Sequence, residues 1–154
     1  MLKNKLCVAV HFVWATWDRQ PLITEAVERD LYKYIEAVCA DDHCKVLALG
    51  GMPDHVHLLV LLSNTVTMAD FMRHVKGGSS RFIPKCLTPG SWFAWQGSYG
   101  AFSVSQANIP KSGCLHPKPK TAPHRRNAVS KRRRNQRNCP IRTRASYSLR
   151  SVAE

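Results

Sequence analysis

Long apolar runs are missing from this chain of 154 residues. The stretch LLVLLS at residues 58–63 has the length of a strand, whereas a membrane-spanning helix needs roughly 20 apolar residues. The opening residues, MLKNKLCVAV, lack the apolar length and the small-residue cleavage site of a signal peptide. We therefore expect a cytoplasmic protein with no membrane partner, in which the six scattered cysteines are reduced thiols.

Acidic residues are scarce only at one end of the chain. Residues 1–110 contain 10 Lys and Arg against 9 Asp and Glu, a net charge of +1. Residues 111–154 contain 13 against 1, a net charge of +12. The overall charge of +13 therefore says little about the first 110 residues, and a case for nucleic-acid binding there has to come from motifs.

Residues 111–154 are also poor in large apolar side chains. They contain four prolines, no sustained hydrophobic period and a cationic run from Lys131 to Arg134. Such a segment cannot bury enough apolar surface to order itself. We predict one folded domain over residues 1–110 and a disordered basic tail over residues 111–154.

Hydrophobic patterns in the first 110 residues indicate alternating strands and helices. Strands are predicted over residues 7–17, 44–53, 55–63 and 91–105, the last as a strand or a bent hairpin. Apolar residues at helical spacing predict helices over residues 23–42 and 67–83, with Thr24 and Thr67 as N-caps. The order of elements matches a ferredoxin-like, split βαβ arrangement, an α+β fold with an antiparallel sheet and helices on one face.

Two histidines interrupt the apolar strand at residues 55–63. His55 and His57 are two residues apart, so both imidazoles point to the same face of the strand and can reach one ion. Neutral imidazole binds several divalent metals. The alternative is a pair of partly buried strand histidines that hydrogen bonds satisfy.

Four segments together resemble the REP-associated group of single-tyrosine HUH transposases, of the insertion-sequence-200-like type. They are VHFVWATWDRQPLI, GMPDHVHLLV, FMRHVKGGSSRFI and FAWQGSYGAFSVSQANI, in this order between residues 7 and 110. The resemblance implies a homodimeric nuclease that binds hairpins in single-stranded DNA, and cleaves and rejoins DNA through a tyrosine nucleophile during transposition. It also implies that His55 and His57 hold Mg²⁺ or Mn²⁺, which would polarise the scissile phosphate.

Four other side chains are candidates for DNA contacts. Lys76 and Arg81 flank the sequence GGSS and could bind phosphates, or they could belong to an ordinary solvated helix end. Trp95 and Tyr99 could stack on unpaired bases, although aromatic residues in a strand are also typical of a core.

The nucleophile of the family is missing from its expected place. After the segment that GAFSVS resembles, the family has a helix with the pattern Tyr-Ile-x-x-Gln-x-x-His-His, in which Tyr attacks the phosphate and Gln is a third metal ligand. This chain has CLHPKPKTAPH instead. Without that helix, the remaining domain is expected to expose apolar surface and to be marginally stable.

The genetic code allows the missing pattern in another reading frame. When the codons for residues 114–126 are read one base later, Leu115 permits Tyr, Pro119 permits Gln, and Ala122 with Pro123 permits His-His. We hypothesise that the frame slipped between about residues 106 and 114, which makes the tail out-of-frame translation and this copy inactive. The rival hypothesis is a purposeful cationic tail that binds nucleic acid.

Two other functions remain open. One is a non-catalytic remnant that still binds DNA. The other is a small zinc-binding regulator that uses Cys39, His43 and Cys44 of CADDHC, although this spacing lacks a second ligand pair.

Overall fold

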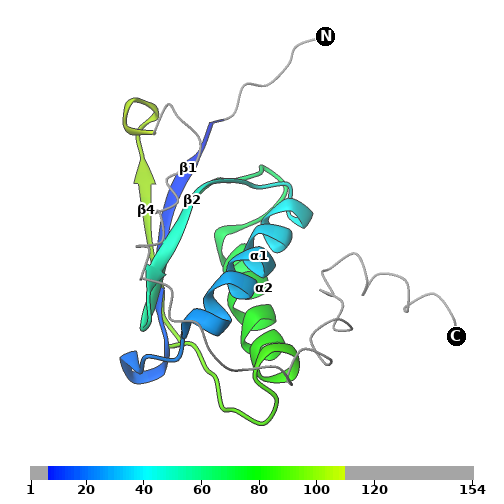
Figure 1. Cartoon of the computed structure of the whole chain (residues 1–154). Coiled ribbons are helices and arrows are strands. Elements are labelled where there is room, and N and C mark those ends of the chain that lie inside the picture. The colour runs from blue at the N-terminus through cyan, green and yellow to red at the C-terminus, as the bar shows by residue number, and fades with distance from the viewer. Residues whose placement is uncertain (1–6, 110–154) are drawn as a thin grey trace, which may run out of the picture.

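A computed structural model describes residues 7–109 of the chain (Figure 1). It contains four strands, β1 (Ala9–Ala15), β2 (Lys45–Met52), β3 (His55–Leu61) and β4 (Gly100–Val104). The two long helices are α1 (Glu25–Asp41) and α2 (Met68–Phe82). The basic segment 111–154 lies outside the described residues. The predictions of disorder and of a frame slip concern this segment and therefore stay predictions.

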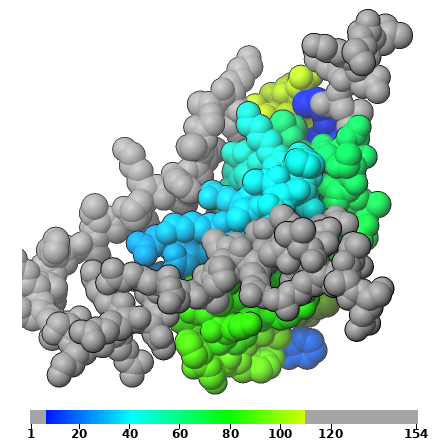
Figure 2. Space-filling view, turned by 90° about the vertical axis from the view of Figure 1, so that its right-hand side faces the viewer, coloured from blue at the N-terminus to red at the C-terminus, as the bar shows by residue number. Residues whose placement is uncertain are grey.

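The strands form one antiparallel sheet in the order β2-β3-β1-β4. Both helices lie on the same side of this sheet (Figure 1). Figure 2 faces this helix layer and shows α1, in blue to cyan, running across it above the green residues that include α2. The predicted α+β, ferredoxin-like arrangement with helices on one face is therefore confirmed.

Three short elements complete the described chain. They are two 3₁₀ turns, η1 (Trp17–Arg19) and η3 (Gln106–Asn108), and a π-helical turn, η2 (Ile83–Leu87), that directly follows α2. Residues 91–99, predicted to begin the last strand, contribute only an isolated bridge from Trp95 to Thr16 before β4 starts at Gly100.

Alternation along β1 and β3 builds the core. Every second side chain of each strand faces the helices, and these are Val10, Phe12 and Trp14 of β1 with Val56, Leu58 and Val60 of β3, all at most 2% exposed. Apolar residues at helical spacing on α1 and α2 cover them, including Leu31, Ile35, Phe71 and Val75 at 0% exposure. The other face of these strands is consequently turned away from both helices.

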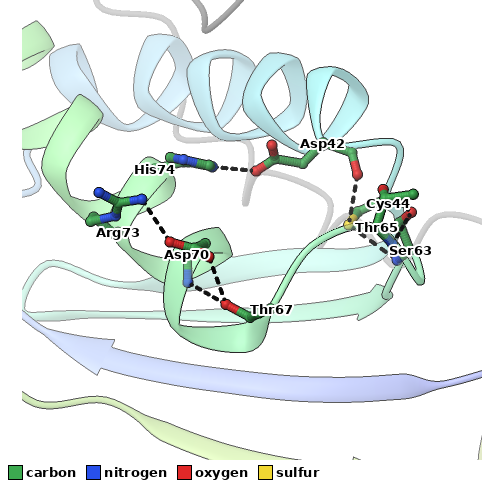
Figure 3. Close-up of polar contacts among 8 residues, drawn as sticks. All are labelled: Asp42, Cys44, Ser63, Thr65, Thr67, Asp70, Arg73 and His74. Carbon is green, nitrogen blue, oxygen red and sulfur yellow. Dashed lines mark hydrogen bonds and ion pairs between the residues drawn. The ribbon is translucent and has the colours of Figure 1, made fainter.

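Polar contacts fix the end of α1 and the start of α2 (Figure 3). The Asp70 backbone N–H donates to the Thr67 hydroxyl, as expected of an N-cap, whereas Thr24 makes no side-chain cap bond. His74 of α2 pairs with Asp42 after α1, with 2.8 Å between Nδ1 and Oδ2. The His74–Asp42 contact thus connects α2 to the end of α1.

Glycine at position 78 allows α1 and α2 to pack closely. A Cβ atom there would collide with the Tyr34 hydroxyl and lie 3.1 Å from Tyr34 Cζ. The Tyr34 ring is 5% exposed and stacks on Phe82 with 4.7 Å between centroids, so it has little room to move. At the adjacent Gly77 the nearest atom to such a Cβ is an Arg81 guanidinium nitrogen at 3.8 Å. GGSS therefore serves helix packing through its second glycine.

These two glycines give a matched pair of variants. Gly78→Ala should lower the free energy of unfolding by about 1–3 kcal/mol, the usual cost of overpacking a core. Gly77→Ala should leave it unchanged or raise it by up to about 1 kcal/mol, because alanine favours a helix. Urea unfolding followed by circular dichroism measures both, and equal effects of the two variants would contradict this account of the helix contact.

The structure can be compared with two predictions from the sequence, the lack of a membrane-spanning segment and the reduced state of the cysteines. No helix within residues 7–109 is long and apolar enough to cross a membrane. Cys7, Cys39 and Cys44 are free thiols, and burial raises the pKa of Cys39 to about 12. Cys86, however, is disulfide-bonded, so the prediction of reduced thiols is wrong at this residue.

Candidate metal centre

The two histidines of β3 lie on the face of the sheet opposite α1 and α2. We call this the open face, and its side chains from the two central strands are Ala9, His11, Val13 and Ala15 of β1 and His55, His57, Leu59 and Leu61 of β3. All of them except the buried Ala9 are partly buried. The centroids of the His55 and His57 rings are 5.0 Å apart. The strand alternation thus places both imidazoles side by side, as the spacing predicts.

A third histidine joins them from β1. His57 is paired with Val13 in the antiparallel register, and His11, two residues before Val13, points to the same face. His11 Nε2 lies 3.0 Å from His57 Nδ1, and the two rings stack with 5.2 Å between centroids. Sequence analysis missed His11 because nothing local shows which residue of β1 will meet His57.

An acidic residue and an arginine hold the other histidine. Asp54, in the turn between β2 and β3, has its Oδ1 atom 2.7 Å from His55 Nδ1. Its Oδ2 atom accepts a hydrogen bond from Arg19 at 3.1 Å. Arg19 reaches this position from η1, where Asp18 and Arg19 adopt the left-handed φ values of 52° and 51°. Sequence analysis named neither Asp54 nor Arg19 as part of a site.

Electrostatics favours the ligand form of His57. Burial lowers the pKa of His57, and the neighbouring His11 and His55 lower it further. An imidazole must be neutral to donate a lone pair to a metal. Asp54 is kept as a carboxylate by the hydrogen bond from His55 and by Arg19, which lower its pKa.

A cavity borders His55 where β1 meets the segment before β4. Its volume is about 260 Å³, and it lies between the β1 segment 13–15, Arg19 and the residues that lead into β4, including Gln96, Ser98 and Tyr99. The Tyr99 side chain is 38% exposed, so its ring is accessible to a ligand. The cavity is thus lined by an aromatic residue, an amide residue, a hydroxyl residue and a cation, together with His55.

Comparison with known proteins identifies the family. The family model described as "Transposase IS200 like" matches residues 5–112. The chain belongs to the IS200-like transposase family. Over 102 residues it is 30% identical to the ISDra2 transposase TnpA of Deinococcus radiodurans, a match that covers 62% of this chain and 72% of that protein.

Two solved structures resemble this IS200-like transposase. A Deinococcus radiodurans protein described as a transposase is 26% identical, with a TM-score of 0.61 and coverage of 70% of this chain and 88% of that chain. A REP-associated tyrosine transposase bound to a REP hairpin is 15% identical, with a TM-score of 0.52 and coverage of 68% and 63%. The similarity to the REP-associated transposase concerns the fold alone. The match to the family model confirms the family resemblance that the sequence motifs indicated.

The described residues supply two candidate ligands and no third. Within residues 7–109, no group of three or more His, Cys, Asp or Glu side chains is arranged to hold a metal ion. Cys39 and Cys44 are buried in the core and His43 is exposed, so the CADDHC segment gathers no zinc site either. The histidine pair has the right chemistry for a metal, but its shell has to be completed by other donors.

The candidate DNA contacts occupy very different surroundings. The Lys76 ammonium lies 2.7, 3.1 and 2.9 Å from the carbonyl oxygens of Gln96, Gly97 and Ser98, which uses all three of its N–H donors. Burial lowers the pKa of Lys76. Lys76 therefore holds the segment before β4, and its ammonium lies 5.8 Å from the centroid of the Tyr99 ring.

The other two candidates are Trp95, which contacts α2, and Arg81, which lies in α2. Trp95 is 8% exposed, and its indole N–H donates to the hydroxyl of the buried Ser79 of α2 at 2.9 Å, so the ring is part of the core. Arg81 is exposed and its Nε donates to the Gly77 carbonyl one turn earlier in α2. Of the four predicted contacts, only Tyr99 lines the cavity beside His55.

Proposed function

We propose that this IS200-like transposase binds hairpin-bearing single-stranded DNA on its open face and holds Mg²⁺ or Mn²⁺ with His55 and His57. The observation that carries the proposal is the adjacent pair of imidazoles, of which His55 borders a cavity that is also lined by Tyr99 and Arg19. The REP-associated relative bound to a hairpin supports this choice of DNA. The dimer expected for the family stays part of the proposal.

The residues fit a divalent ion. Both ring Nδ1 atoms contact protein groups, the rings are adjacent, and the lowered pKa of His57 favours its neutral form. When bound, the ion would supply positive charge where charge develops on a scissile phosphate. The remaining positions of its shell suit DNA phosphate oxygens, water, or a ligand from another part of the chain.

Tyr99 and Arg81 keep proposed roles in binding DNA. The Tyr99 ring contacts Phe12 and Lys76 on the helix side and lines the cavity that borders His55, where we assign it to stacking on an unpaired base. The exposed Arg81 guanidinium retains free N–H donors for a phosphate, away from the metal centre. Lys76 and Trp95 have structural roles. Lys76 holds the segment before β4, and Trp95 packs in the core.

We also propose that this copy does not form a covalent tyrosine linkage. Tyr32 and Tyr34 of α1 face the core, where burial raises the pKa of Tyr32 and Tyr34 is 5% exposed. Tyr99 belongs to the sheet segment and not to the helix that carries the nucleophile in the family. None of the tyrosines within residues 7–109 therefore takes the place of the family's nucleophile, and we propose the non-catalytic DNA-binding remnant as the function of this polypeptide.

DNA binding tests the role of Tyr99. Tyr99→Ala should weaken binding of a hairpin-bearing single strand by about 5- to 150-fold, which corresponds to the loss of about 1–3 kcal/mol of base stacking. Tyr99→Phe keeps the ring and should bind like the unaltered chain. Fluorescence anisotropy at fixed salt measures all three proteins. Equal affinities of the alanine and phenylalanine variants would show that the ring does not stack on DNA.

A further inference from the structure

Each histidine of the pair has one ring nitrogen held by a neighbouring side chain, and it is the same nitrogen in both rings. His55 Nδ1 lies 2.7 Å from Asp54 Oδ1, and His57 Nδ1 lies 3.0 Å from His11 Nε2. Within residues 7–109, neither His55 Nε2 nor His57 Nε2 has a hydrogen bond. The two free nitrogens are therefore equivalent atoms on adjacent rings.

We propose that Asp54 and His11 are positioning residues: Asp54 fixes the tautomer and orientation of His55, and His11 fixes the orientation of His57, so that both Nε2 atoms are presented to one divalent ion. This inference rests on the proposed metal-binding function. Beyond that function, it specifies which ring atoms bind the metal and where the ring hydrogens lie. It also assigns a role to two residues that do not contact the metal. Ligating histidines commonly donate their second ring N–H to such a partner.

The hydrogen positions follow from donor and acceptor chemistry. A carboxylate only accepts, so the hydrogen between His55 and Asp54 sits on His55 Nδ1, and the neutral ring keeps its lone pair on Nε2. For His57 to present the same lone pair, its Nδ1–H must donate to His11 Nε2, and His11 must carry its own hydrogen on Nδ1. The opposite arrangement would place a hydrogen on His57 Nε2 and prevent binding.

Arg19 fixes the carboxylate in turn. It donates to Asp54 Oδ2, which leaves Oδ1 for His55. The Arg19 side chain is 70% exposed while that of Asp54 is 26% exposed. We therefore expect a smaller effect from Arg19 than from Asp54, because water can replace part of an exposed interaction.

Mn²⁺ titration followed by electron paramagnetic resonance tests the two positioning roles. Asp54→Ala and His11→Phe should each weaken Mn²⁺ binding by about 10- to 100-fold, the usual range for partners of metal ligands. His11→Phe retains an aromatic ring against His57 while it removes both nitrogens. Asp30→Ala is the matched control, because Asp30 has a 28% exposed carboxylate that contacts Arg29 and Lys33 on α1.

A second readout separates positioning from general loss of structure. Long-range ¹H–¹⁵N correlation spectra of the metal-free protein should show His55 with its hydrogen on Nδ1. Asp54→Ala should move that hydrogen toward Nε2, and Arg19→Gln, a second variant with the carboxylate intact, should do so to a smaller extent. Asp54→Ala should fold, because Thr16 binds the backbone carbonyl of Asp54 and not its side chain.

The outcomes distinguish this inference from the function on which it rests. If His55→Ala and His57→Ala leave Mn²⁺ affinity unchanged, the proposed metal site is wrong, and the inference is wrong with it. If those two variants lose binding while Asp54→Ala and His11→Phe stay within twofold of the unaltered chain and the His55 tautomer is unmoved, the positioning roles alone are overturned.

Discussion

His57→Ala and His55→Ala should each weaken Mn²⁺ binding by more than about 100-fold, beyond the usual effect of changing a residue that only supports a metal ligand. Within residues 7–109 no group of three or more His, Cys, Asp or Glu side chains is arranged to hold a metal ion, so the loss of either imidazole leaves one ligand of the pair. Isothermal titration with Mn²⁺ measures the affinity directly.

His43→Asn is the control for this experiment. His43 is exposed beside Asp42 at the end of α1 and adopts a φ of 56°, a conformation that asparagine tolerates. It should bind Mn²⁺ like the unaltered chain. A similar loss in all three variants would indicate nonspecific binding to surface histidines and would contradict the site.

A one-base deletion in the coding sequence between codons 106 and 114 should produce a protein that forms a covalent adduct with hairpin-bearing single-stranded DNA. The shifted frame permits Tyr-Ile-x-x-Gln from position 115, which restores the nucleophile and the third ligand that the family places on its last helix. The expected change is from no adduct to an adduct that survives denaturing electrophoresis.

Two controls make this result interpretable. Replacement of the restored tyrosine by phenylalanine should abolish the adduct, because phenylalanine has no hydroxyl to attack phosphorus. Tyr99→Phe in the unaltered chain should change nothing. An adduct from the unaltered chain that disappears with Tyr99→Phe would make Tyr99 a nucleophile and refute the claim that this copy lacks one.

The sequence predicted that His55 and His57 share one face of their strand, because strand alternation is a local rule. Residues i and i+2 share a face, and Val56 and Leu58 at 0% exposure show that the face of His55 and His57 is the one turned away from the core. The order of strands and helices likewise followed from hydrophobic periods, which burial enforces element by element.

The surroundings of the pair could not be predicted in the same way. His11 contacts His57 only because β1 pairs with β3 in one particular antiparallel register. In the sequence these two strands are separated by α1 and β2. Arg19 reaches Asp54 through a left-handed turn at residues without glycine. Contacts between distant segments also decide the environments of Lys76 and Trp95, which local patterns left open between DNA binding and structure.

The most direct test of the account is the metal dependence of hairpin binding by the unaltered chain. Anisotropy titrations with Mn²⁺ and with a chelator should show tighter binding of hairpin-bearing single-stranded DNA in the presence of the metal, and no such difference for a chain with both His55→Ala and His57→Ala. A metal effect of equal size in both proteins, or none in the unaltered chain, would contradict the claim that this histidine pair joins metal and DNA on the open face.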